Sequence, residues 1–199
     1  SARQADIELE VRSGCTLRSQ ANWFHHWYSN REKTTVAISI ARHLDGYLMR
    51  FPDLADFIIS SDGARVVCEP CSETQAHTIR HLFLDQVIPR ILGQRGDVIL
   101  HASAIDLAKN VGVAFTGFSG WGKSTLASSF KDENARLIGD DCLKLKVVDG
   151  KLTGIPAYQG SRLCEDSIEA LYPAVVKSLY VSGYSKKQRV LASSDRSVS

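Results

Sequence analysis

One stretch near the middle of the chain decides the fold, and it reads Gly117-Phe118-Ser119-Gly120-Trp121-Gly122-Lys123-Ser124-Thr125. It fits the pattern G-x-x-x-x-G-K-[S/T] of a phosphate-binding loop. The apolar run from Val111 to Thr116 predicts a strand before the loop, and Ser124 to Lys131 predicts a helix after it. A Gly-rich turn with a chance Lys-Ser pair is the alternative, but the strand and helix on either side favour a phosphate site.

The residue types of this loop suit an oligophosphate, and we expect all of Gly117 to Thr125 to contact a nucleotide. The three glycines permit backbone angles that turn successive N–H groups inward as a cradle for an anion. Lys123 would reach the β and γ phosphates as a mobile charge, and Ser124 would supply a hard oxygen to Mg²⁺. The loop therefore predicts ATP and Mg²⁺ as ligands.

Two adjacent acids follow the loop at short range. Arg136 to Gly139 predicts a short strand that ends in Asp140-Asp141. Because the intervening helix is short, we expect this return strand to lie directly beside the loop and to bring both acids to the phosphates. One acid could then hold Mg²⁺ while its neighbour accepts a hydroxyl proton. A solvated Asp-Asp turn is the alternative, and the nearness of the loop favours the metal or base role.

Two further side chains are candidates for the same site. His101 lies on a strand predicted from Val98 to Ile105, which would pair with the strand entering the loop through a turn around Lys109-Asn110. A histidine there is either a satisfied core residue or a group that contacts phosphate or tunes the acids, and both readings stay open. Arg162 could neutralise charge on the transferring group or cover apolar surface with its stem, and we favour the first.

Apolar periodicity divides the chain into three segments. Residues 1–73 predict a small, mainly antiparallel β module, 74–96 a connecting amphipathic helix, and 97–199 an α/β unit. The helix carries the apolar stripe Ile79, Phe83, Val87 and Ile91, with Leu84 and Ile88 beside it, and Pro89 should kink its last turn. In the α/β unit, alternating residues from Leu143 to Val147 and from Lys151 to Ile155 predict a hairpin turning at Asp149-Gly150.

The β module shows four predicted strands separated by turn signals. Asp45-Gly46 and Asp62-Gly63 are the residue pairs of tight hairpins, in which both central positions need positive φ. The strands are Thr35 to Ile40, Tyr47 to Phe51, Phe57 to Ser60 and Arg65 to Cys68. Ahead of them, the aromatic run Trp23 to Tyr28 could stack bases or bind a partner, but core packing is the commoner use of such residues and is what we expect.

Two possible metal sites in this half are weak. Cys68 and Cys71 have the spacing of half a zinc or redox site, but no second pair completes it. His77, His81 and Asp85 share one helix face without the arrangement H-E-x-x-H, so we expect a solvated face. Near the other end of the chain, Lys186, Lys187 and Arg189 are open candidates for a substrate clamp.

Composition excludes several classes of protein. Lys and Arg number 24 against 22 for Asp and Glu, a net charge of +2 among 199 residues, which gives no global reason to expect nucleic acid or a membrane surface as partner. Ser1 to Glu10 lacks the apolar core of a secretory signal. The five cysteines are scattered without a disulfide-scaffold spacing. We expect a soluble, cytoplasmic protein with reduced thiols.

Taken together, the loop, the acids and the upstream histidine resemble a known family. From about Val98 to Arg162 the chain resembles the catalytic domain of HPr kinase/phosphorylase, in which a Leu-His element opens a β-hairpin that leads to a phosphate loop, a short helix and a strand ending in Asp-Asp. Leu100-His101 and Asp140-Asp141 flank the loop in that order. The resemblance implies an α/β P-loop kinase fold of the HPr kinase/phosphoenolpyruvate carboxykinase type with a mixed sheet.

The resemblance also implies roles for single residues. Asp140 would be the general base toward a serine hydroxyl, Asp141 and Ser124 would hold Mg²⁺, and His101 would lie in the catalytic pocket. Thr125 stands where HPr kinases carry an acidic residue. Kinase-like relatives that modify peptides, including those similar to kinases of lasso precursor peptides, therefore match the chain as well.

We therefore predict an ATP- and Mg²⁺-dependent phosphotransferase that acts on a hydroxyl of a protein or peptide, with a homo-oligomer left open. Lys123, Asp140, His101 and Arg162 are the predicted catalytic residues. The alternative is a nucleotide-binding regulatory module without phosphotransfer. A transport ATPase and a GTPase are disfavoured, because the chain has neither Leu-Ser-Gly-Gly-Gln nor Asn-Lys-x-Asp.

Overall fold

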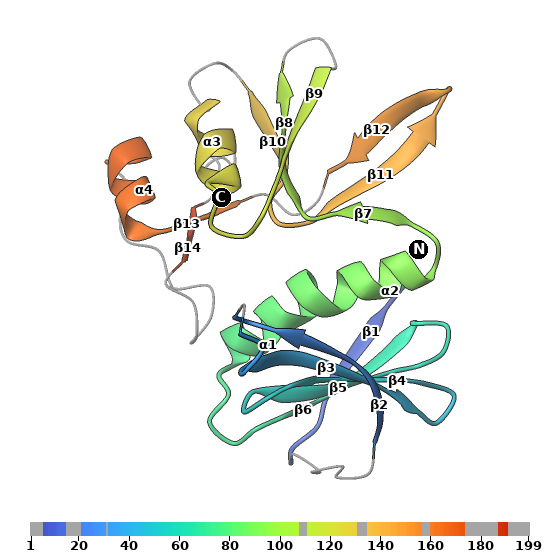
Figure 1. Ribbon diagram of the computed structural model, residues 1–199. Helices are drawn as coiled ribbons and strands as arrows, with labels where there is room; N and C mark the ends of the chain where they lie inside the picture. Colours follow the sequence, from blue (N-terminus) through green and yellow to red (C-terminus); the bar gives the residue numbers. More distant parts are fainter. Residues whose placement is uncertain are drawn as a thin grey trace, which may run out of the picture. The chain divides into compact units, whose positions relative to one another are not determined.

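The chain forms two compact units, residues 1–95 and 96–199. A computed structural model describes residues 6–14, 21–30, 32–107, 111–130, 135–156, 160–173 and 187–190. Each unit has its own sheets and its own apolar core (Figure 1). None of the helices in these ranges is long and apolar enough to span a membrane.

The first unit is built on a six-stranded sheet in the order β1-β6-β5-β4-β3-β2. Neighbours from β2 to β6 pair antiparallel, whereas β1 pairs parallel to β6. The four strands predicted from the sequence are confirmed as β3 to β6. The strands are β1 (Glu8–Val11), β2 (Asn22–Tyr28), β3 (Val36–His43), β4 (Gly46–Phe51), β5 (Ala55–Ile59) and β6 (Arg65–Pro70).

The two predicted Asp-Gly turns differ from expectation. Leu44 and Asp45 connect β3 to β4, with Leu44 at φ 51°, and Gly46 already pairs with His43 in the ladder. The predicted turn was therefore wrong by one residue. Glycine is needed at 46 for a different reason: a Cβ there would lie 2.0 Å from the carbonyl oxygen of Ile59. In the second turn only Gly63, at φ 69°, has positive φ.

A broken helix covers one face of this sheet (Figure 1). It consists of α1 (Ala76–Leu82), a π-helical turn η1 (Phe83–Val87) and α2 (Ile88–Gln94). Pro89 falls in the first turn of α2, where its missing N–H costs little, and the π turn before it absorbs the irregularity. From the predicted stripe, Ile79, Val87 and Ile91 are buried in the core, and Leu82 at the end of α1 is buried with them.

The aromatic run does not pack the core as expected. It forms β2, at the edge of the sheet, where Phe24 is 56% and Trp27 59% exposed. Arg42 on the neighbouring strand lies 5.9 Å from the ring centre of Phe24 and 5.2 Å from that of Tyr47. These contacts hold the ring of Phe24 on the surface of the unit.

The second unit begins with strands that belong to different sheets. The strand predicted from Val98 to Ile105 is interrupted at His101, so that β7 (Val98–Leu100) joins the sheet β12-β11-β7 and β8 (Ala102–Leu107) joins β10-β8-β9. β8 pairs antiparallel with β9 (Val111–Thr116), as predicted. The turn predicted at Lys109-Asn110 lies outside the described residues.

The remaining elements of this unit surround the Gly-rich loop, which joins β9 to α3. β10, the return strand expected beside the loop, is the neighbour of β8, which lies between β9 and β10 in the sheet. The predicted hairpin β11–β12 is confirmed, with Asp149 at φ 50° and Gly150 at φ 73° in its turn. The elements are α3 (Lys123–Ser129), β10 (Arg136–Gly139), β11 (Leu143–Val148), β12 (Lys151–Ile155), β13 (Ser161–Leu163), α4 (Glu165–Leu171) and β14 (Gln188–Val190).

We expect Gly46→Ala to lower the free energy of unfolding by about 2 kcal/mol or more, because the added methyl group meets backbone that cannot move aside cheaply. Gly93→Ala is the matched control, since its Cβ would meet nothing within 4 Å and it lies in α2. That change should raise stability by up to about 1 kcal/mol. Chemical denaturation of both variants checks this, and equal effects would contradict the close approach at Gly46.

Candidate functional site

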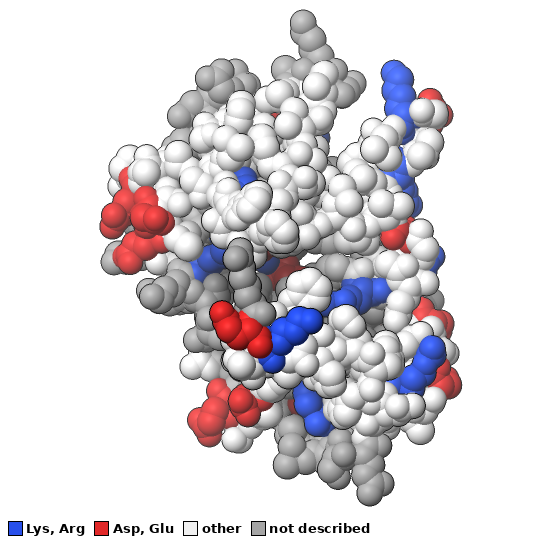
Figure 2. Space-filling view, in the orientation of Figure 1, with Lys and Arg blue, Asp and Glu red and all other residues white. Residues whose placement is uncertain are grey.

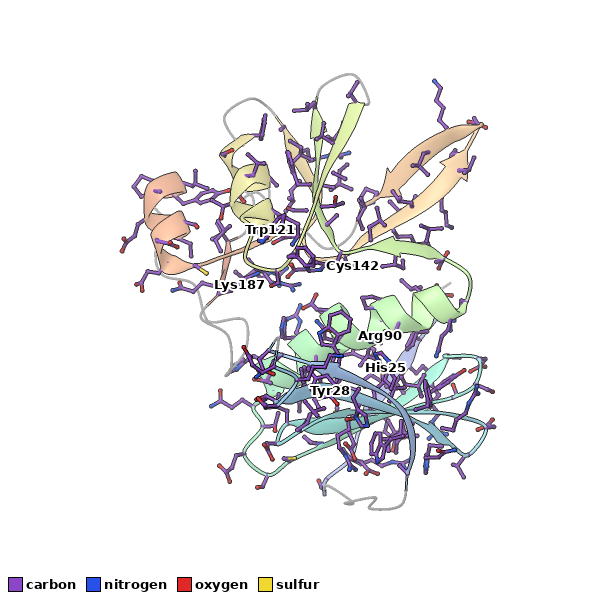
Figure 3. The ribbon with its side chains drawn as sticks, in the orientation of Figure 1. His25, Tyr28, Arg90, Trp121, Cys142 and Lys187 are labelled. Atoms are coloured by element: carbon purple, nitrogen blue, oxygen red, sulfur yellow. The ribbon has the colours of Figure 1, made fainter. Side chains whose placement is uncertain are left out.

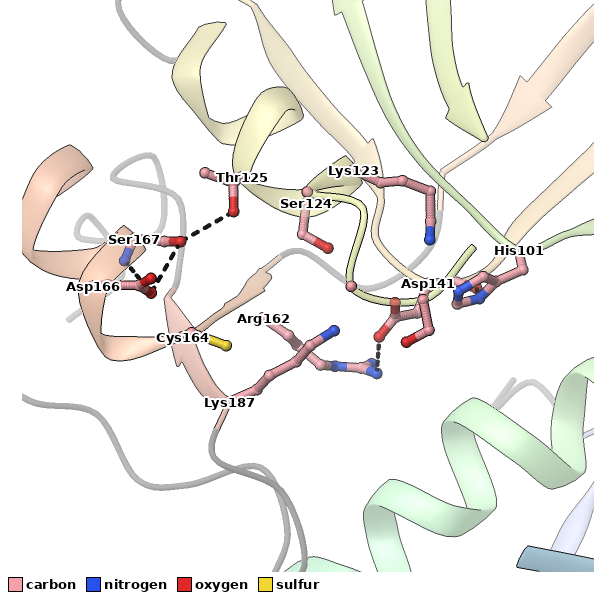
Figure 4. Close-up of a pocket in the computed structure, with 13 residues that line it drawn as sticks. His101, Lys123, Ser124, Thr125, Asp141, Arg162, Cys164, Asp166, Ser167 and Lys187 are labelled. Carbon is pink, nitrogen blue, oxygen red and sulfur yellow. Dashed lines mark hydrogen bonds and ion pairs between the residues drawn. The ribbon is translucent and has the colours of Figure 1, made fainter. Parts of the chain in front are cut away.

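A cavity of about 260 Å³ lies in the second unit beside the Gly-rich loop (Figure 4). It is lined by the loop, the start of α3, the end of β10 and the segment from β13 to α4. The lining residues are His101, Ser119, Gly120, Gly122, Lys123, Ser124, Thr125, Asp141, Arg162, Cys164, Asp166, Ser167 and Lys187. Most of the residues predicted for the site thus meet in one place. Asp140, Gly117, Phe118 and Trp121 are not among the lining residues.

Two glycines of the loop adopt left-handed backbone angles. Gly120 has φ 84° and Gly122 φ 80°, and Gly122 is the residue before α3. A Cβ at either position would meet no atom within 4 Å, so glycine serves the left-handed backbone there and not a close contact. The result is a loop whose backbone borders the cavity at Ser119, Gly120 and Gly122.

Lys123 is bound within its own loop. Its Nζ donates to the carbonyl oxygens of Gly117 at 3.0 Å and Phe118 at 3.1 Å, and the residue is 8% exposed. Both acceptors are neutral. An anion in the cavity would compete for this ammonium group with the stronger interaction of opposite charges.

Two loop residues predicted to contact nucleotide point away from the cavity. Phe118 is 74% and Trp121 72% exposed, and their rings meet edge to face with centres 5.1 Å apart. Trp121 projects from the loop at the base of α3 (Figure 3). The loop therefore presents its small residues to the cavity and an aromatic pair to its outside.

The adjacent acids have different environments. Asp140 is 2% exposed, and its Oδ2 accepts a hydrogen bond of 2.8 Å from the backbone N–H of Arg162. Its Oδ1 is buried and meets no hydrogen-bond partner among the residues that the structure describes. Asp141 lines the cavity in a left-handed conformation, φ 66°, and its Oδ2 accepts from the guanidinium of Arg162 at 2.9 Å.

The environment of Asp140 raises the pKa of its carboxyl group. Burial is the main cause, and the charge of Asp141 adds to it. The N–H of Arg162 and the hydroxyls of Ser124 and Ser103 oppose the shift by stabilising the carboxylate. Both hydroxyls act from close by, although neither meets the geometric limits of a hydrogen bond to Oδ1.

His101 and Arg162 both hold the acid pair in place. The Nδ1 of His101 lies 2.9 Å from the carbonyl oxygen of Asp141. A carbonyl oxygen only accepts, so Nδ1 carries a proton and donates in this hydrogen bond. His101 is exposed, which rules out the core reading. The side chain of Arg162 is 3% exposed and bonded to an acid, so it does not simply cover apolar surface with its stem.

Sequence reasoning did not find several residues of the cavity. Cys164, Asp166 and Ser167 come from the start of α4, and Ser167 lies 3.1 Å from the hydroxyl of Thr125 (Figure 4). No local motif marks them, because only the packing of α4 against α3 brings them to the loop. Exposed acidic side chains gather over α4 (Figure 2), where its first turn holds Glu165 and Asp166. Lys187, an open candidate, also lines the cavity.

The weak metal candidates of the first unit do not come together as a metal site: Cys68 is buried, Cys71 is half-buried and His77 is exposed. Burial, with Glu69 and Asp56 nearby, raises the pKa of the Cys68 thiol to about 12, so the thiol stays protonated. No group of three metal-binding side chains occurs within the described ranges of the chain. The helix face expected to be solvated instead holds a packed ion pair, in which His81 Nδ1 lies 2.7 Å from Asp85 Oδ2.

We expect Asp140→Asn to raise the melting temperature by a few degrees near neutral pH. The carboxyl has a higher pKa in the folded state than its unfolded value of 3.8, so the folded state holds the proton more tightly. Wild-type stability should therefore fall as pH rises above 3.8 towards the folded pKa. Asparagine stays neutral and can still accept from Arg162.

Thermal melts from pH 3 to pH 8 measure this effect. Below the unfolded value of 3.8 the variant should have no advantage, because both carboxyls are then protonated. Asp149→Asn, in the exposed turn of β11–β12, is the control and should leave the pH profile unchanged. A pH profile for Asp140→Asn that parallels wild type would contradict the raised pKa.

Comparison with known proteins gives one informative similarity. No protein-family model matches the chain. The chain is 36% identical over 81 residues to the HPr kinase/phosphorylase of Clostridium tetani (strain Massachusetts / E88). The match covers 41% of this chain and 26% of that protein. It supports a distant relationship to HPr kinase/phosphorylase, confined to part of each chain.

Proposed function

We propose that this chain is an ATP- and Mg²⁺-dependent phosphotransferase that acts on a hydroxyl group, most simply a serine, of a protein or peptide. The observation that carries the proposal is the cavity itself, which brings Lys123, Ser124 and Arg162 together with Asp141 beside a Gly-rich loop. The partial similarity to a protein named HPr kinase/phosphorylase supports a kinase and a protein acceptor. The P-loop kinase fold is part of the same proposal.

Ser124 and Asp140 offer oxygen atoms that suit a magnesium ion. The hydroxyl of Ser124 and the carboxylate of Asp140 are close neighbours, and Oδ1 of Asp140 is a buried oxygen without a partner in the described parts of the chain. Hard oxygen ligands are what Mg²⁺ requires, with water and phosphate oxygens completing its shell. When bound, the ion neutralises charge that develops on the β and γ phosphates. We assign its binding to Ser124 and Asp140.

This assignment exchanges the roles that the sequence suggested for the two acids. A general base has to reach the acceptor hydroxyl, and Asp140 is 2% exposed with one oxygen already bonded to Arg162. Asp141 faces the cavity and is open to an incoming group. We therefore propose that the carboxylate of Asp141 takes the hydroxyl proton of the acceptor.

The cations of the cavity supply the remaining electrostatics. Lys123 would give up its hydrogen bonds to the loop carbonyls and bind phosphate oxygens instead. An ammonium group binds an anion more strongly than a neutral carbonyl. Arg162 keeps Asp141 oriented and places a guanidinium where the transferred group gains negative charge. Catalysis in this scheme is mainly positioning and charge stabilisation.

Lys123→Ala should lower phosphate transfer by about 100-fold or more, because it removes a cation next to the reacting phosphates. The measurement is transfer of labelled γ-phosphate from ATP to proteins and peptides of a host lysate, with labelled products identified by mass spectrometry. Lys151→Ala, in the exposed hairpin β11–β12, is the matched control and should not change transfer. Nucleotide binding without labelled product from wild type would favour a regulatory module.

Asp140→Asn and Asp141→Asn should separate the two acid roles. We expect Asp140→Asn to weaken Mn²⁺ binding, measured by electron paramagnetic resonance with ADP present, by about 10-fold or more because it removes a charged ligand. Asp141→Asn should bind Mn²⁺ and ADP nearly as wild type but lower transfer by about 100-fold or more. The reverse pattern would restore the roles suggested by the sequence.

A further inference from the structure

Ser103 is an unusual residue for its place in the sheet. It lies on β8, the central strand of β10-β8-β9, opposite Phe115, and is fully buried at 0% exposed. Its hydroxyl meets no hydrogen-bond partner among the described residues. A buried polar group left unpaired destabilises the folded state, and alanine in the same place would avoid this cost. This hydroxyl therefore calls for a functional explanation.

The register of β10 against β8 leads Asp140 toward Ser103. Leu137 on β10 pairs with Ile105, and a regular ladder would continue with Ile138 opposite Ala104. The pairing instead shifts, so that Gly139 lies opposite Ala104. Asp140 is the residue after Gly139, beyond the end of β10, and the same offset continued by one residue would bring it level with Ser103. Without this bulge, Ser103 would face Gly139, so the irregularity is what brings the two side chains together.

The two unpaired atoms are chemically complementary. Oδ1 of Asp140 is a buried acceptor without a partner in the described residues, and the hydroxyl of Ser103 is a buried donor in the same situation. The hydroxyl is close enough to act on this carboxyl group and lower its pKa, although the two atoms do not form a hydrogen bond. A serine hydroxyl rotates freely about its C–O bond, so a small movement is enough to make the bond.

We propose that Ser103 is a positioning residue, whose hydroxyl donates to Oδ1 of Asp140 and keeps the carboxylate turned toward Ser124. Arg162 holds Oδ2 from the other side through its backbone N–H, so the two contacts together fix the plane of the carboxylate. This inference rests on the proposed function, in which Ser124 and Asp140 hold Mg²⁺. Hydrogen bonds to ligating carboxylates are a general means of orienting them for a metal.

The test measures metal binding separately from turnover. We expect Ser103→Ala to weaken the binding of Mn²⁺ to the full chain with ADP by about 10- to 100-fold. Affinity for ADP without metal should stay at the wild-type value, because Ser103 does not line the cavity. Ser103→Thr and Ser103→Cys retain a donor and should recover part of the loss. Ser129→Ala, on the exposed side of α3, is the matched control and should bind Mn²⁺ as wild type.

Each outcome decides the inference. Wild-type Mn²⁺ affinity in Ser103→Ala, with the loss still seen in Asp140→Asn, would overturn the role of Ser103 and leave the proposed function standing. Failure of the wild-type chain to bind Mn²⁺ with ADP would overturn both. If Ser103→Ala has a lowered melting temperature, the Thr and Cys variants decide: recovery of stability without recovery of Mn²⁺ affinity would show a packing role only.

Discussion

The site depends on one constraint, the juxtaposition of two carboxylates on consecutive residues that follow the edge strand β10. Like charges this close repel, and burial adds the cost of removing Asp140 from water. Arg162 offsets both penalties, since its backbone N–H binds Asp140 at 2.8 Å and its guanidinium binds Asp141 at 2.9 Å. β13 therefore has to lie next to the end of β10, and this packing closes one side of the cavity.

Backbone irregularities on two strands serve the same arrangement. The break at His101 ends β7 and starts β8, and it leaves the imidazole free to bond the carbonyl of Asp141. The shift in the β8–β10 ladder carries Asp140 one step further along its partner strand. Asp141 then turns the chain in a left-handed conformation, which an aspartate tolerates better than most residues. Strain of this kind is commonly concentrated at functional sites.

Local signals in the sequence predicted the individual strands better than where strands break and which strands pair. The strand before the loop, the hairpin at Asp149-Gly150 and the strands β3 to β6 follow from patterns of a few residues, and all are present. The break at His101 and the insertion of β8 between β9 and β10 depend on which distant strands pair, and no short pattern encodes that. Position 46 is a further example, because glycine is required there by the backbone of Ile59 on another strand, which no local pattern shows.

The difference between the two acids could not be predicted for the same reason. Both are aspartates, and the sequence assigns their roles only through resemblance to a family. Their separation comes from the alternation of the strand, which sends Asp140 inward and lets the following turn carry Asp141 into the cavity. Environments that push neighbouring carboxyls apart in burial and pKa allow one to serve as a fixed ligand and the other as a proton acceptor. The end of β10 thus gives two chemically identical residues different environments.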